Sequence, residues 1–268
     1  MTAPEKDRPL ALVTGASSGI GYELAKLFVG HGYDLVVAAE DERLDRAAEV
    51  LGQASGGTVT PVRADLRRPE SVETLFEAVT ATGRPLAAAA LNAGVGRGGA
   101  FVETDLDDEQ EIIDLNISST VHLAKLVLRD MVGRGAGRVL VTSSIASTMP
   151  GSFQAVYNAS KSFLQSFTEA LQNELKDSGV TITSLTPGPT ETDFFHRADM
   201  DDTRVGASSK DDPAQVAEQG FQAMLNGDAK VIAGSVSTKA SGVANAVLPD
   251  AAKAQMHRLM AEPGSAES

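Results

Sequence analysis

The chain has 268 residues, of which 42% are hydrophobic and only 4% aromatic, and its formal net charge is −13 at pH 7. This charge would repel polyanions, so we expect neither a nucleic-acid partner nor adhesion to anionic membranes. Cysteine is absent, which excludes disulfides, thiolate catalysis and metal sites built on cysteine. The length suits a single α/β domain over residues 1–268. Because no apolar run approaches the ~20 residues that span a bilayer, we expect a cytoplasmic protein.

Short apolar segments alternate with amphipathic ones along the chain, which predicts strands alternating with helices. The predicted strands are Leu10–Thr14, Asp34–Ala39, Thr58–Arg63, Leu86–Leu91, Arg138–Thr142, Val180–Leu185 and Lys230–Ala233. The predicted helices are Ile20–Val29, Arg43–Leu51, Pro69–Thr80, Asp107–Met131, Tyr157–Lys176 and Pro213–Leu225. This order predicts an α/β fold with a doubly wound parallel sheet (Rossmann fold), about seven strands flanked by helices on both faces.

Three polar segments stand outside this alternation. We interpret residues 199–213 as a mobile lid, with an ordinary surface loop as the alternative. Residues 1–7 and 261–268 are expected to be disordered, because terminal segments are poorly held unless they are tied down.

A glycine-rich turn, Thr-Gly-Ala-Ser-Ser-Gly-Ile-Gly from Thr14 to Gly21, joins the first strand to the first helix. Its glycines allow a tight turn and let a pyrophosphate approach the backbone. The beginning of the helix offers free N–H groups and the positive end of the helix dipole to phosphates. The turn therefore predicts a dinucleotide site that includes Gly15, Ser17, Ser18, Gly19, Ile20 and Gly21.

A tyrosine and a lysine four residues apart, Tyr157 and Lys161, share one face of a predicted helix. A phenol has a pKa of about 10 and is a poor base near neutrality, but a nearby ammonium lowers that pKa. We expect Tyr157 to exchange a proton with an alcohol or carbonyl while a hydride moves, with Ser144 bonding the same oxygen. The alternative is an incidental surface pair, because this short spacing also arises by chance.

Several motifs follow one another in the order of a single family. They are Thr14–Gly21, Leu91-Asn92-Ala93-Gly94, Asn116, Ser144 with Tyr157 and Lys161, and Pro187-Gly188 with Thr190 and Thr192. The set resembles the classical short-chain dehydrogenases/reductases (SDR) over residues 10 to about 195. Leu91 departs from the family pattern, which has Asn there.

The resemblance implies an NAD(P)-dependent oxidoreductase that interconverts an alcohol and a carbonyl by hydride transfer, acting on CH–OH groups. The implied catalytic residues are Asn116, Ser144, Tyr157 and Lys161. Asn116 would hold a water that links Lys161 to solvent, and the alternative for Asn116 is a structural role at a helix kink. The implied cofactor contacts further include Asp65, Leu66, Asn92, Ala93, Gly94, Tyr157, Lys161, Pro187, Gly188, Thr190 and Thr192. A homotetramer or homodimer through the two long helices is also implied.

The end of the second strand usually decides between NAD and NADP. Ala39 stands at the family's usual acidic position, and Glu40 stands where phosphate-binding members carry Arg. Glu40 would repel a 2′-phosphate, and no Lys or Arg occurs from Thr14 to Ile20, so we predict NAD, with NADP as the alternative. Arg43 opposes this prediction if its side chain reaches back to the position of a 2′-phosphate.

Phe194 and Phe195 either wall a substrate pocket or belong to the core, and Met149, Phe153 and Gln154 precede Tyr157 at the expected substrate edge.

Two further interpretations concern metal and function. The histidines are scattered without a second ligand at metal spacing, so no metal is expected. The alternative function is a non-catalytic dinucleotide-binding regulator on the same fold, although such a protein would not need Ser144, Tyr157, Lys161 and Asn116 together.

Overall fold

The computed structural model describes residues 8–245 and 248–267, so the disorder predicted for residues 1–7 and for residue 268 falls outside the described part. Its centre is a seven-stranded sheet in the order β3-β2-β1-β4-β5-β6-β7, with every neighbouring pair parallel. The strands are β1 (Leu10–Thr14), β2 (Asp34–Ala39), β3 (Val59–Arg63), β4 (Leu86–Leu91), β5 (Gly137–Thr142), β6 (Val180–Pro187) and β7 (Lys230–Ala233). The predicted doubly wound fold is confirmed.

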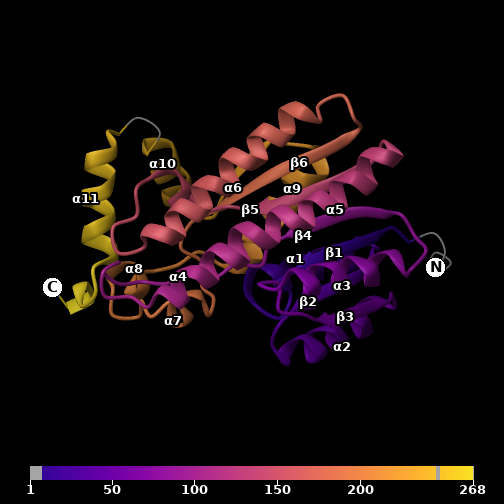
Figure 1. The fold of residues 1–268 in the computed structure, drawn as a ribbon, viewed down its shortest axis with the longest axis horizontal. Coiled ribbons are helices and arrows are strands. Elements are labelled where there is room, and N and C mark those ends of the chain that lie inside the picture. The colour runs from indigo at the N-terminus through magenta and orange to yellow at the C-terminus, as the bar shows by residue number, and fades with distance from the viewer. Residues whose placement is uncertain (1–7, 246–247, 268) are drawn as a thin grey trace.

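Helices cover both faces of the sheet (Figure 1). One face packs against α3, α5 and α6 through residues such as Leu75, Leu123 and Leu164. The other packs against α1, α2 and α9, where Leu24 and Phe221 are fully buried. The bounds are α1 (Gly19–Gly30), α2 (Arg43–Ser55), α3 (Pro69–Thr80), α5 (Ser119–Arg134), α6 (Ala155–Glu174) and α9 (Pro213–Asn226). Because β1 and β2 are covered on both faces, all their residues are buried, which explains their continuous apolar runs.

The uninterrupted helix predicted over Asp107–Met131 is wrong in one respect. Between α4 (Leu106–Ile112) and α5 the chain makes a π-helical turn over Ile113–Ser118. Apolar periodicity does not reveal this turn, because it adds a single residue and apolar side chains continue through it at Ile113, Leu115 and Ile117. Such turns frequently occur at functional sites.

Four helices that the sequence did not predict gather beyond one end of the sheet (Figure 1). They are α7 (Phe194–Arg197), α8 (Arg204–Ala207), α10 (Val236–Ala244) and α11 (Asp250–Ala261). None of the described helices is long and apolar enough to cross a membrane.

The segment 199–213, interpreted above as a lid, contains α8 and contacts the end of the chain. Gly264 N donates to Asp202 Oδ2 at 2.8 Å, and Arg204 N donates to Ser265 Oγ at 3.0 Å. The described part of the C-terminal segment expected to be disordered thus lies against this loop. Movement of the segment stays a prediction.

Candidate active site

A cavity of about 660 Å³ opens at the carboxyl ends of the parallel strands, where ligands bind in folds of this kind. The predicted residues on its wall are Gly15, Ser17, Ser18, Gly19, Ile20, Glu40, Asp65, Leu66, Asn92, Ala93, Gly94, Ser144, Tyr157, Lys161, Pro187, Gly188, Thr190 and Thr192. Gly21 and Asn116 lie outside this wall. The cavity volume is in the range of small-molecule and cofactor sites.

The glycine turn has no room for side chains at its three glycines. Gly15 and Gly19 have left-handed backbones, with φ of 66° and 56°. A Cβ on Gly21 would lie 2.1 Å from the Gly15 carbonyl oxygen. The first turn of α1 carries no acidic side chain, and its cap Ser18 makes no side-chain capping bond. Nothing in that turn therefore offsets the positive end of the helix dipole, and the turn fits a dinucleotide pyrophosphate.

Hydrogen bonds from two threonines hold the strand ends beside this turn. Thr14 Oγ1 accepts from Asn92 N at 2.9 Å and from Ala93 N at 3.0 Å. Thr142 Oγ1 donates to Asn92 Oδ1 at 3.0 Å. Neither threonine was predicted from the sequence to hold the site, because their partners lie 50 or more positions away. Through its backbone N–H and its side chain, Asn92 thus ties β1, β4 and β5 together at the cavity wall.

Ser144, Tyr157 and Lys161 come together at the cavity. The Ser144 hydroxyl shares the cavity wall with the Tyr157 phenol and acts to lower its pKa. Lys161 is 4% exposed, donates from Nζ to the Thr142 carbonyl at 3.1 Å, and places Nζ 5.8 Å from the centre of the Tyr157 ring. The Phe194 ring centre lies 5.1 Å from that of Tyr157, so Phe194 walls the pocket.

Burial dominates the titration of this pair. It raises the pKa of Tyr157 to about 12, although Ser144 acts in the opposite direction. Burial lowers the pKa of Lys161 to about 8. The expected net lowering of the Tyr157 pKa is therefore wrong, because burial outweighs the groups that favour the phenolate. At neutral pH the group is a neutral phenol, which is the form that donates a proton.

Asn116 lies in the π-helical turn and is completely buried. Its Oδ1 accepts from Val95 N at 2.9 Å, and its Nδ2 donates to Val95 O and to Ser160 Oγ, both at 2.9 Å. These bonds fasten the loop after β4 to α6, which matches the structural alternative. The water-relay role stays a prediction.

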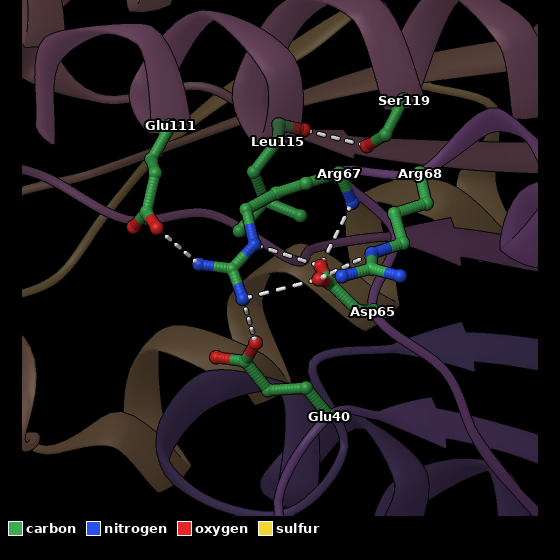
Figure 2. A network of polar contacts seen from close by, with 7 residues as sticks. All are labelled: Glu40, Asp65, Arg67, Arg68, Glu111, Leu115 and Ser119. Carbon is green, nitrogen blue, oxygen red and sulfur yellow. Dashed lines mark hydrogen bonds and ion pairs between the residues drawn. The ribbon is translucent and has the colours of Figure 1, made fainter. Parts of the chain in front are cut away.

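Charged side chains gather where β2 and β3 end, and Figure 2 shows Arg67 between three carboxylates. Arg67 Nη2 donates to Glu40 Oε2 and its Nε to Asp65 Oδ1, both at 2.7 Å, while Nη1 lies 2.8 Å from Glu111 Oε1. The hydrogen bonds from Arg67 hold the pKa of Asp65 below its usual value. This guanidinium is therefore shared among acidic partners.

Arg43 is held in a similar way and does not stand free beside Glu40. Its Nε donates to Asp41 Oδ1 at 3.0 Å and its Nη1 to Asp193 Oδ2 at 2.6 Å. Ser17 Oγ donates to Asp41 Oδ2 at 2.7 Å. Burial opposes ionisation of Asp41, but the bonds from Arg43 and Ser17 outweigh it and leave its pKa below the usual value. Neither Asp41 nor Asp193 was predicted from the sequence to have a role.

Comparisons with known proteins agree with this geometry. The family model described as short chain dehydrogenase matches residues 9–203. The 3-oxoacyl-(acyl-carrier-protein) reductase of Salmonella typhimurium is 32% identical over 197 residues, which cover 74% of this chain and 79% of that protein. The oxidoreductase UcpA of the same organism is 32% identical over 209 residues, covering 77% and 76%.

Two solved structures are similar over most of their length. A short-chain dehydrogenase from Sphingobium yanoikuyae in complex with NADPH has a TM-score of 0.78 and 29% identity, covering 84% of this chain and 87% of its own. A short chain dehydrogenase/reductase from Burkholderia phymatum in complex with NAD has a TM-score of 0.80 and 26% identity, covering 91% and 93%.

Proposed function

Because the chain belongs to the short chain dehydrogenase family and is an NAD(P)-dependent oxidoreductase of alcohols and carbonyls, we propose that Ser144, Tyr157 and Lys161 carry out its proton transfer. The main support is that Ser144, Tyr157 and Lys161 line the same cavity, with Lys161 Nζ 5.8 Å from the centre of the phenol ring. When bound, the nicotinamide cofactor supplies or accepts the hydride.

In the reducing direction, the Tyr157 hydroxyl gives its proton to the carbonyl oxygen while the carbonyl carbon receives the hydride. The C=O π bond breaks, one C–H and one O–H bond form, and Tyr157 is left as a phenolate. Ser144 donates a hydrogen bond to the same oxygen. Lys161, with a pKa of about 8, is mostly an ammonium at pH 7 and stabilises the phenolate.

The substitution Tyr157→Phe tests this assignment, because it removes the proton donor and keeps the ring. We expect turnover of ketones to fall by about 10³-fold or more, while the Kd of the reduced cofactor, measured by its fluorescence, is unchanged. Tyr33→Phe is the matched control, since Tyr33 is partly buried against the core beside Phe28 and lies off the cavity wall. Retained turnover in Tyr157→Phe would refute the mechanism.

We propose NAD as the preferred cofactor, with NADP as the alternative. The support is that Glu40 lies on the cavity wall, whereas Arg67 and Arg43 are both committed to carboxylates. A 2′-phosphate would have to displace those acidic partners. We expect NADH to bind more tightly than NADPH in a fluorescence titration. Glu40→Gln should reduce the difference between the two Kd values. Tighter binding of NADPH by the unaltered protein would contradict the proposal.

We also propose a cytoplasmic location and a homotetramer, or a homodimer, built through α5 and α6. Both long helices leave apolar side chains partly uncovered, Val132 at 38% and Phe163 at 40% exposure. Light scattering of the purified protein tests the assembly, and a monomer mass would contradict it.

A further inference from the structure

A buried glutamine lies one helical turn before Tyr157 on the cavity wall. Gln154 is 7% exposed and is the residue that caps α6. Its side chain makes no capping bond, and glutamine is not among the residues that cap helices well. Its Nε2 is buried and has no hydrogen-bond partner within residues 8–245 and 248–267. Buried polar groups are normally paired, so this amide calls for a partner from outside the chain.

The backbone around Gln154 is firmly held, although its side chain makes no capping bond and its Nε2 has no partner in the described chain. Gln154 N donates to Gly151 O at 3.0 Å, and Asn158 N donates to Gln154 O at 2.9 Å. The preceding residue, Phe153, has a left-handed backbone with φ of 65°, which is costly for a bulky side chain. Such strain persists where the surrounding structure fixes it and is common in ligand sites.

A second polar side chain reaches the same loop from α11. His257 lines the cavity, and its Nδ1 donates to the Ser152 carbonyl at 2.8 Å. Burial lowers the pKa of His257, which favours the neutral ring. Because a carbonyl only accepts, the proton of the neutral ring sits on Nδ1, and Nε2 is left as an acceptor.

Apolar side chains also line the cavity that holds these two groups. Met149, Phe194 and Met260 lie on the same wall as Gln154 and His257. A few polar groups set in an apolar wall typically fix the orientation of a ligand. An amide donor and an imidazole acceptor together suit an oxygen function on the substrate.

We propose that Gln154 is a specificity-determining residue that binds a second oxygen of the substrate, next to the carbonyl that Tyr157 protonates. The substrate class is then a vicinal hydroxyketone or diketone, or the diol formed from it, and not a simple ketone. This inference rests on the proposed function of Tyr157. Gln154 Nε2 donates to the second oxygen, and His257 accepts from it when that oxygen is a hydroxyl.

The test uses three ketones of one shape: cyclohexanone, its α-hydroxy derivative and the vicinal diketone of the same ring. With the reduced cofactor in excess, we expect kcat/KM for the two oxygenated compounds to exceed that for cyclohexanone by about tenfold to a hundredfold. Gln154→Met should remove this preference. It should leave kcat/KM for cyclohexanone within about twofold of the value for the unaltered protein, because the plain ketone makes no contact with the amide. Gln154→Glu keeps the shape, loses the donor, and should also lose the preference.

Thr168→Val is the matched control, because Thr168 is a fully buried residue of α6 whose Oγ1 has no partner in the described chain, and it lies off the cavity wall. It should leave all three rates unchanged, and cofactor fluorescence reports whether each variant is folded. Equal loss on all three ketones in Gln154→Met, or no preference in the unaltered protein, would overturn the subsite alone. Failure of the folded protein to reduce any ketone would overturn the proposed function and the subsite with it.

Discussion

The two ends of the cavity are built in different ways. The end formed by the glycine turn and Asn92 consists of backbone packed so closely that a Cβ on Gly21 would lie 2.1 Å from another residue's carbonyl oxygen. The end formed by α10 and α11 consists of side chains, and Met256 and Met260 on α11 are 51% and 41% exposed. A backbone-made surface tolerates few changes, which suits a common cofactor. A side-chain surface is easily altered, which suits a substrate that differs among relatives.

The largest effect on cofactor binding should come from adding a side chain at the glycine turn, where backbone atoms are packed closely together. Gly21→Ala would place Cβ 2.1 Å from Gly15 O and 2.6 Å from Asn92 Nδ2, and backbone cannot easily yield. We expect the cofactor Kd to rise by about 100-fold or more, with a loss of roughly 1–3 kcal/mol in the free energy of unfolding. The measurements are fluorescence titration and urea unfolding.

Gly30→Ala is the control for that substitution, because it lies in the same helix with nothing within 4 Å of the added Cβ. It should keep the cofactor Kd and gain up to about 1 kcal/mol in stability. Equal effects of the two substitutions would remove the distinction between the two ends.

The second largest effect should come from the burial of Lys161, which lowers the free energy of unfolding near neutral pH. Its pKa falls from the ordinary lysine value of 10.5 to about 8 in the folded protein, so between these values only the unfolded chain holds the proton. The free energy of unfolding should therefore rise with pH over this window, by about 1.5 kcal/mol from pH 8 to 9.5. Tyr157, raised from 10.0 to about 12, acts in the opposite direction above pH 10.

Lys161→Met should abolish this rise and make the protein more stable than the unaltered one at pH 7, as measured by urea unfolding. Lys176→Met removes an exposed lysine and should leave the rise in place. The same slope in Lys161→Met and the unaltered protein would show that the ammonium is not desolvated in the fold.

The parts predicted from sequence are those determined by local chemistry. The strands β1 and β2 are buried on both faces and appear as apolar runs, and the turn at Gly15 and Gly19 needs glycine for its left-handed backbone. Tyr157 and Lys161 are one helical turn apart, so their spacing alone places them together. These features need no knowledge of what lies across the fold.

The parts that were missed depend on contacts between distant residues. Arg43 meets Asp193 across 150 positions, and Thr14 meets Asn92 across 78. Helix α11 has a weakly amphipathic sequence with several exposed apolar side chains, so periodicity did not mark it. The sign of the Tyr157 pKa shift was also missed, because it depends on burial, which the spacing to Lys161 does not reveal.

A smaller effect is expected where one surface ion pair spans the cofactor end. Asp193→Asn removes the partner of Arg43 Nη1 and so loosens the link between α2 and the loop after β6. Both side chains are about half exposed, 48% and 53%, so the link is weak and screened by salt. We expect the cofactor Kd to rise about twofold to fivefold at low salt and to match the unaltered protein at 1 M salt.

Asp45→Asn is the control, since Asp45 forms a comparable exposed pair with Arg63 and lies off the cavity wall. It should leave the Kd unchanged at every salt concentration. A salt-independent change in Asp193→Asn would point instead to a rearranged loop.

The smallest effect should come from the end of the cavity that is built from side chains. It should appear in the KM of the carbonyl substrate and not in the Kd of the cofactor. Lys253 Nζ donates to the Thr148 carbonyl at 3.0 Å and pairs with Asp250 at 2.8 Å, which fastens α11 to the loop after Ser144. Lys253→Met should raise the KM of the carbonyl substrate by about twofold to threefold and leave the cofactor Kd unchanged. Asp250→Asn removes only the exposed ion pair and should do less. An equal rise of cofactor Kd and substrate KM in Lys253→Met would mean that α11 acts on the whole cavity, and the two ends would no longer be separable.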